Sequence, residues 1–178
     1  ISSRSSKQPS QPSEDAHDHP CRCGHALQRH LSPGEQMHQN PSADELRALL
    51  DRSTTIAVVG ASSNPERPSY GVMKTLQHAG FTVIPVNPKE AEILGARAYA
   101  SLAEIPVPID IVDVFRKPDD TPQVADEAVH AKAKALWLQA GISSEEAASR
   151  AAAGGLTVVM DLCIAATVAR LGITKHPR

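Results

Sequence analysis

One stretch of the chain, residues 54–89, limits the possible folds more than any other. Residues 55–59 form a β-branched, almost continuous apolar run, T-I-A-V-V, which is typical of a parallel strand buried on both faces. A helical pattern follows from about Ser69, a good N-cap residue, and stops at Gly80. A second β-branched run occupies residues 81–86. The stretch therefore predicts one strand–helix–strand unit with a right-handed crossover.

The loop after the first predicted strand favours a phosphate group but departs from the usual dinucleotide pattern. That pattern reads G-x-G-x-x-G, whereas residues 60–65 read G-A-S-S-N-P and hold one glycine. Backbone N–H groups and the helix N-terminus behind this loop still favour a pyrophosphate, and Arg67 adds a bidentate donor nearby. The candidate ligand contacts in this segment are Gly60, Ala61, Ser62, Ser63, Pro65 and Arg67.

The end of the second predicted strand narrows the choice of ligand. NAD sites place an acidic residue there to hold the ribose hydroxyls, but this chain carries Asn87, Pro88 and Lys89. A cation at this point suits a phosphorylated ribose. The residues alone therefore leave coenzyme A and NADP open, and a strand–helix–strand unit without a ligand remains a third alternative.

The rest of the chain continues the alternation of strand and helix. We predict a helix capped by Ser42, further strands at 109–115, 135–138 and 156–160, and helices at 119–134, 143–154 and 164–171. The pattern predicts an α/β fold, a doubly wound (Rossmann-like) sheet of five parallel strands with helices on both faces, over residues 41–178. Asp110 and Asp113 alternate within one strand, which indicates an exposed strand end or a nearby sheet edge.

Several residues directly follow these strands and are expected to face one crevice, because the carboxyl ends of parallel strands meet at the same edge of a sheet. They are Phe115, Arg116, Gln139, Ala140, Gly141 and Cys163. Gly141 would let the backbone approach a ligand closely. Cys163 has two interpretations: a thiol facing the reactive end of a ligand, or a small buried apolar residue.

Composition excludes some classes of partner. The chain has 178 residues and a net charge of −2, which gives no indication of binding to nucleic acid or to an anionic membrane surface. No apolar run approaches the roughly 20 residues of a membrane span. A single cysteine in the predicted domain suits a reducing cytoplasm.

Residues 1–40 differ in composition from the rest, being rich in Ser, Pro, Gln and His, and are predicted to be disordered. They include the cluster H-D-H-P-C-R-C-G-H at residues 17–25. Its cysteines are spaced C-x-C, not C-x₂₋₄-C as in structural zinc sites, so we predict no metal site there. In the predicted domain, we find no Ser-His-Asp set, paired carboxylates or metal triad, and His78 and His130 fall on helices away from the crevice.

Six segments in order carry a family resemblance: VVGASSNPERPSYGVM, VIPVNPK, LGARAYASLAEIP, IDIVDVFRKP, ALWLQAGI and GLTVVMDLC. Residues 54–171 thereby resemble the CoA-binding domain family of small, stand-alone Rossmann-type proteins. They are also similar to the CoA-binding part of the succinyl-CoA synthetase α subunit and of ADP-forming acyl-CoA synthetases. The resemblance implies that the loop at 60–63 and the strand ends at 87–89, 115–116 and 139–141 contact coenzyme A, and it favours coenzyme A over NADP.

The resemblance has one departure. Many members of the family read M-D-R-C after the fifth strand and carry a Glu-His pair shortly afterwards, whereas this chain has Leu162 in place of the Arg and lacks the pair. The phosphoryl-transfer and nucleotide-grasp domains that the synthetases need are not apparent either. We therefore expect a cytoplasmic protein that binds coenzyme A or an acyl-CoA as a small-molecule ligand, without identifiable catalytic machinery. The alternatives are an NADP-dependent oxidoreductase and a redox sensor in which Cys163 forms a mixed disulfide with coenzyme A.

Overall fold

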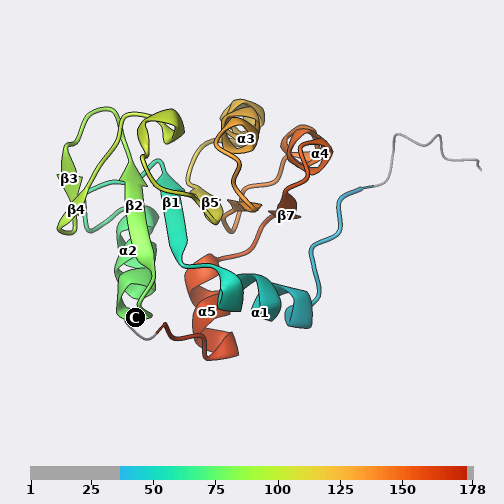
Figure 1. The fold of residues 1–178 in the computed structure, drawn as a ribbon, viewed down its shortest axis with the longest axis horizontal. Coiled ribbons are helices and arrows are strands. Elements are labelled where there is room, and N and C mark those ends of the chain that lie inside the picture. The colour runs from blue at the N-terminus through green and yellow to red at the C-terminus, as the bar shows by residue number, and fades with distance from the viewer. Residues whose placement is uncertain (1–36, 176–178) are drawn as a thin grey trace, which may run out of the picture. The chain divides into compact units, whose positions relative to one another are not determined.

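A parallel sheet runs through the centre of the structure, a computed structural model that describes residues 37–175 (Figure 1). Its five strands pair in the order β2-β1-β5-β6-β7, and every pairing is parallel. The strands are β1 (Thr55–Val59), β2 (Thr82–Val86), β5 (Ile111–Val114), β6 (Ala135–Leu138) and β7 (Thr157–Val159). The predicted doubly wound sheet of five parallel strands is thus confirmed.

Helices cover both faces of the sheet (Figure 1). One face carries α1 (Ala43–Arg52), α2 (Pro68–His78) and α5 (Ile164–Leu171). The other carries α3 (Thr121–His130), α4 (Glu145–Ala153) and the short 3₁₀ helix η1 (Leu102–Glu104). A second 3₁₀ turn, η2 (Pro118–Asp120), leads into α3, and β3 (Glu92–Ile93) pairs antiparallel with β4 (Ala96–Arg97) after β2.

The three-layer arrangement explains why the strands read as apolar runs. Successive residues of a strand point to opposite faces, and in β1 Ile56 and Val58 join the apolar cluster under α1, α2 and α5. Ala57 and Val59 join the cluster under α3 and α4. Because both faces are covered, neither set can be polar, and each fully buried large aliphatic side chain contributes about 1.5–3 kcal/mol to stability.

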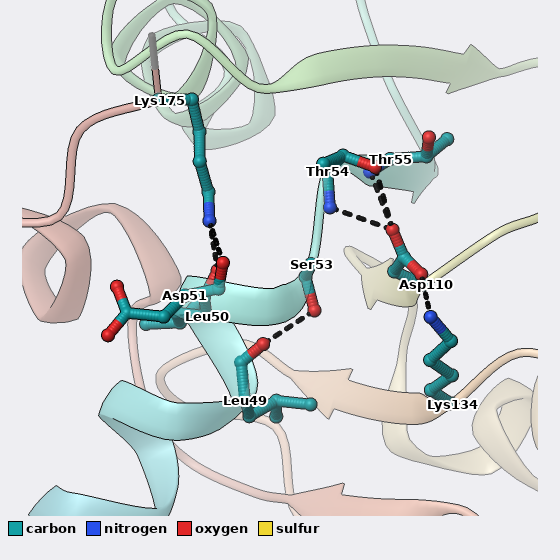
Figure 2. Close-up of polar contacts among 9 residues, drawn as sticks. All are labelled: Leu49, Leu50, Asp51, Ser53, Thr54, Thr55, Asp110, Lys134 and Lys175. Carbon is teal, nitrogen blue, oxygen red and sulfur yellow. Dashed lines mark hydrogen bonds and ion pairs between the residues drawn. The ribbon is translucent and has the colours of Figure 1, made fainter.

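A buried carboxylate ties together the amino-terminal ends of three strands (Figure 2). Asp110 Oδ2 accepts hydrogen bonds from the backbone N–H groups of Thr54, at 2.7 Å, and Thr55, at 3.0 Å. Its Oδ1 lies 2.6 Å from Lys134 Nζ. Burial raises the pKa of Asp110, but the ion pair and these N–H groups outweigh it and lower the pKa to about 2. The cluster therefore fixes the starts of β1, β5 and β6.

The prediction that Asp110 and Asp113 mark a sheet edge is wrong. They belong to the segment of β5, the middle strand of the sheet, and they are 6% and 0% exposed. Asp110 is tolerated because partners inside the protein engage both of its oxygens, whereas only one oxygen of Asp113 has a partner among the described residues.

Lys175 fastens the last described residues to the helical layer (Figure 2). Its ammonium donates to the carbonyls of Leu50 and Asp51, each at 2.6 Å, at the carboxyl end of α1. It also lies 5.1 Å from the centre of the Phe81 ring. Burial lowers the pKa of Lys175, although nearby Asp51 and Asp110 oppose that shift. A cation is favourable here because the last carbonyls of a helix lack partners within it.

Local boundaries differ from the predictions in a few places. The predicted cap Ser69 is wrong, because α2 begins one residue earlier at Pro68 with Arg67 as its N-cap, and Ser69 is buried. Helix α3 is shorter than predicted because η2 occupies its first residues and Lys132 adopts a left-handed conformation after it. The cap predicted at Ser42 is confirmed, and within the helix predicted at 143–154 the N-cap is Ser144.

Two further predictions concern residues 1–40 and membrane-spanning segments. The His- and Cys-rich cluster at 17–25 lies outside the described residues. Within residues 37–175, no helix has the length and apolar character needed to cross a bilayer. Asn40 is already tied to the domain, because its side chain exchanges two hydrogen bonds of 2.7 Å with the backbone of Met160.

Candidate functional site

The order of the strands creates a crevice between the carboxyl ends of β1 and β5. The chain leaves β1 toward α2 on one face and leaves β5 toward α3 on the other, and ligands of doubly wound folds bind at such a switch point. Gly60 lines this crevice and has a φ of +84°. A Cβ added to Gly60 would lie 2.4 Å from the carbonyl oxygen of Phe115. Only glycine permits this close approach of the loop to β5.

Two adjoining hollows open at this crevice, with volumes of about 440 and 350 Å³. We call the larger the inner hollow and the smaller the outer hollow. Both are lined by Gly60, Arg67, Phe115 and Arg116. Among the predicted contacts, the inner hollow adds Gln139, Ala140 and Cys163. The outer hollow adds Ala61, Ser62, Asn87, Pro88 and Lys89.

Most of the predicted contacts are therefore gathered in one place. Ser63, Pro65 and Gly141 line neither hollow in the described part of the chain. Ser63 and Pro65 are exposed on the loop after β1. Gly141 instead donates its N–H to Asp161 Oδ1 at 2.6 Å, which joins the ends of β6 and β7.

The outer hollow is rich in positive charge. Arg67, Lys89 and Arg116 line it and are exposed. None of the three takes part in an ion pair within residues 37–175. Arg67 is also the N-cap of α2, so the partial positive charge of that helix end adds to the same field. The arrangement suits an anionic ligand group.

Asn87 holds the loop after β1 against the end of β2. Its Nδ2 donates to the Ala61 carbonyl at 2.8 Å, and its Oδ1 accepts from the N–H of Lys89, also at 2.8 Å. Glu90, which the sequence analysis did not select, completes this contact: both of its carboxylate oxygens lie 3.3 Å from the Ser63 nitrogen. Its only signal in the sequence is an acidic residue next to Lys89, four positions after the second strand ends.

A carboxyl group that the sequence analysis did not select lies beneath the inner hollow. Gln139 Nε2 donates to Asp113 Oδ1 at 2.6 Å, and both residues are buried. Asp113 Oδ2 has no hydrogen-bond partner among the described residues. Burial raises the pKa of Asp113 to about 7, although hydrogen bonds from Gln139 and the Val114 backbone oppose the rise. The contact fixes the carboxamide of Gln139 at the wall of the inner hollow.

The end of β7 presents a half-buried thiol to the inner hollow. Cys163 is the N-cap of α5, and its thiol is free. The preceding Leu162, at the position where the family resemblance led us to expect an arginine, packs against the apolar cluster under α1, α2 and α5. Its carbonyl accepts a hydrogen bond of 2.6 Å from Trp137 Nε1. The departure from the family pattern is thus accommodated as apolar packing.

The helical histidines lie outside both hollows. Nδ1 of His78 is 2.9 Å from the Lys74 carbonyl, and Nδ1 of His130 is 2.7 Å from the Asp126 carbonyl. Each contact reaches back four residues within its own helix. The predicted placement of these side chains on helices away from the crevice is confirmed.

Similar proteins include both stand-alone domains and parts of larger enzymes. The chain is 49% identical over 126 residues to the uncharacterized protein YneT of Bacillus subtilis, covering 71% of this chain and 93% of that protein. A solved structure of a hypothetical protein from Pyrococcus horikoshii OT3 matches with a TM-score of 0.72 and 37% identity, covering 76% of this chain and 98% of the other.

A shorter match links the chain to an enzyme. It is 46% identical over 57 residues to the α subunit of the ADP-forming acetate–CoA ligase II of Pyrococcus furiosus, covering 32% of this chain and 12% of that subunit. The family model described as "CoA binding domain" matches residues 54–169, which contain the whole five-stranded sheet and the residues of both hollows. The chain therefore belongs to the CoA binding domain family.

Proposed function

We propose that the chain binds coenzyme A or an acyl-CoA across the carboxyl ends of β1, β5 and β6. The observation that carries the proposal is the pair of adjoining hollows, which share Arg67 and Arg116. Lys89 and the polar loop residues line only the outer hollow, whereas apolar side chains, a carboxamide, a thiol and Lys117 line only the inner one. This division matches the ligand, which has a phosphorylated adenosine end and a long uncharged arm that ends in sulfur.

The phosphates would lie in the outer hollow. Lys89 and Arg67 donate there to phosphate oxygens, and charge-assisted bonds of this kind are among the stronger contacts in proteins. The backbone N–H groups of the loop after β1 and the amino-terminal end of α2 add to the attraction. Arg116, shared by both hollows, sits where the pyrophosphate joins the arm.

The uncharged arm would extend into the inner hollow. Val72 and Ile142 give it an apolar lining, and Phe115 lines both hollows. Gln139, whose Nε2 is occupied by Asp113, offers its carbonyl oxygen to the amide N–H groups of the arm. The thiol or thioester would then end near Cys163. The proposal includes a cytoplasmic location, which the free thiol of Cys163 suits.

Calorimetric titration of the reduced protein with coenzyme A, acetyl-CoA, dephospho-CoA and NADP tests this proposal. We expect micromolar binding of coenzyme A, weakened about tenfold when the 3′-phosphate is missing or in Lys89→Ala. Lys74→Ala, which removes an exposed lysine of α2 that lines neither hollow, is the matched control and should bind normally. Failure of the wild type to bind any CoA species refutes the proposal, and selective NADP binding would favour the oxidoreductase instead.

A second candidate function rests on Cys163 lining the inner hollow with a free thiol. Its thiolate would attack the sulfur of a CoA disulfide, form a Cys163–CoA mixed disulfide and release the other half as a thiol. Incubation with oxidised coenzyme A should then add the mass of one CoA, reversibly with dithiothreitol. Because Cys21 and Cys23 also carry thiols, the comparison is made with both replaced by Ser, and in that background Cys163→Ala should stay unchanged. An unmodified wild-type mass would refute this function without touching the binding proposal.

A further inference from the structure

The loop expected to receive the ligand's pyrophosphate already holds an anion supplied by the chain itself. The N–H of Ser63 points at the Glu90 carboxylate, with both oxygens 3.3 Å from the nitrogen. Glu90 Oε1 also accepts from Asn87 Nδ2 at 3.1 Å. The carboxylate is therefore held between the loop after β1 and the end of β2, next to Ser62 and Lys89, which line the outer hollow.

This carboxylate has the chemistry that the loop would use for a phosphate. Both groups are anionic and accept hydrogen bonds from backbone N–H groups. Glu90 forms no ion pair with the cations of the outer hollow in the described part of the chain, so Arg67, Lys89 and Arg116 stay free to attract a ligand. A ligand phosphate that approaches the loop meets one attractive set of charges and one repulsive carboxylate.

We infer that Glu90 is a specificity-determining residue that occupies the loop's anion position in the free protein and must be displaced by the ligand's pyrophosphate. The inference rests on the proposed function of the same site. Because the phosphate must first displace the Glu90 carboxylate, the loop's N–H groups contribute less to the free energy of ligand binding. The displacement also means that an adenosine without phosphates, which has nothing to exchange for the carboxylate, gains little from this loop.

The substitution Glu90→Gln isolates the charge because it keeps the size and the accepting carbonyl of the side chain. We expect it to tighten the binding of coenzyme A about fivefold, since a partly exposed contact of this kind is modest in strength. Inorganic pyrophosphate, which has no adenosine and no arm, should gain affinity to the same degree. Adenosine should be unaffected.

The matched control is Glu92→Gln, two residues further on and exposed, with Arg97 opposite it in the β3–β4 pairing. Glu92→Gln removes the same charge from the same neighbourhood without changing a contact of the loop after β1. The affinity of this variant for coenzyme A should therefore stay within about twofold of the wild type. Titrations of the full chain with coenzyme A, pyrophosphate and adenosine are compared for the three proteins at one ionic strength.

The outcomes separate the two proposals. A wild type that binds coenzyme A while Glu90→Gln behaves like Glu92→Gln overturns the inference on Glu90 alone. Weaker binding by Glu90→Gln also overturns it, because Glu90 would then hold a donor of the ligand instead of competing with its phosphate. Absence of coenzyme A binding in all three proteins overturns the proposed function, and the inference that rests on it falls too.

Discussion

Replacing Asp113 by Asn should raise the free energy of unfolding at neutral pH. The gain over the wild type should become smaller or disappear in acid. The carboxyl is fully buried, and its Oδ2 has no partner among the described residues. Its pKa is raised by burial from 3.8 to about 7. Between these values the folded chain keeps a proton that the unfolded chain releases, so the free energy of unfolding falls as the pH rises.

The magnitude follows from the size of the shift. The difference between 3.8 and about 7 is about 3 pH units, and each unit is worth about 1.4 kcal/mol, so ionisation costs the wild type about 4 kcal/mol above pH 7. Near pH 5 the cost is only about 1.6 kcal/mol. The carboxamide of the Asp113→Asn variant never ionises and can still accept the hydrogen bond from Gln139. Its N–H₂ group, however, replaces Oδ2 in a site without a partner, at a cost of about 1–3 kcal/mol.

Urea unfolding of both proteins at pH 5, 6, 7 and 8 measures this difference. The stability of Asp113→Asn relative to the wild type should rise by about 3 kcal/mol from pH 5 to pH 8. Asp110→Asn is the control, because the pKa of Asp110 is about 2 and its carboxylate is ionised in both states throughout this range. Its cost, about 1–2 kcal/mol after allowance for the exposure of Lys134, should not vary with pH. A difference for Asp113→Asn that is equally flat would refute the reasoning.

Two further substitutions probe the frame of the site. Gly60→Ala should lower the free energy of unfolding by about 2–3 kcal/mol and abolish coenzyme A binding, because the new Cβ meets the Phe115 carbonyl at a positive φ. Urea unfolding measures the loss of stability and calorimetry the loss of binding. Normal binding of coenzyme A by the variant would contradict the prediction. Lys175→Met should cost about 1–2 kcal/mol in urea unfolding at unchanged coenzyme A affinity, because the Asp51 carbonyl loses its Lys175 donor and the Leu50 carbonyl keeps only the N–H of Ser53, while the apolar stem is kept. A stability equal to that of the wild type would show that the ammonium is not needed there.

Much of the fold could be predicted from the sequence because the strands of a covered parallel sheet leave an unmistakable apolar pattern. The bounds of β1 and β6 agree with the prediction residue for residue, and so do those of α5. The errors fell where the pattern was ambiguous: a carboxylate in a strand resembles an edge until its partners are known. Asp110 has its partners in the segments before β1 and β6, more than twenty residues away in sequence, and no local rule reveals them.

The candidate site was predicted less completely, for a related reason. Residues such as Lys89 and Arg116 directly follow strands, so the topology alone brings them to one crevice. Glu90 and Asp113 were missed because their importance lies in what they contact. The acid of Glu90 reaches across to the Ser63 nitrogen, and Asp113 matters through the carboxamide of Gln139.

The two ends of the sheet differ in how completely their charged groups are paired. At the amino-terminal end, Asp110 has every oxygen engaged by N–H groups and by Lys134, which is what stability alone favours. At the carboxyl-terminal end, a carboxyl oxygen of Asp113 lacks a partner, and cations gather without counter-charges in the described chain. Such unsatisfied groups cost stability, and proteins tolerate them most often near functional sites. The role inferred for Glu90 fits the same logic, since its carboxylate accepts the Ser63 N–H group, which a phosphate would take over.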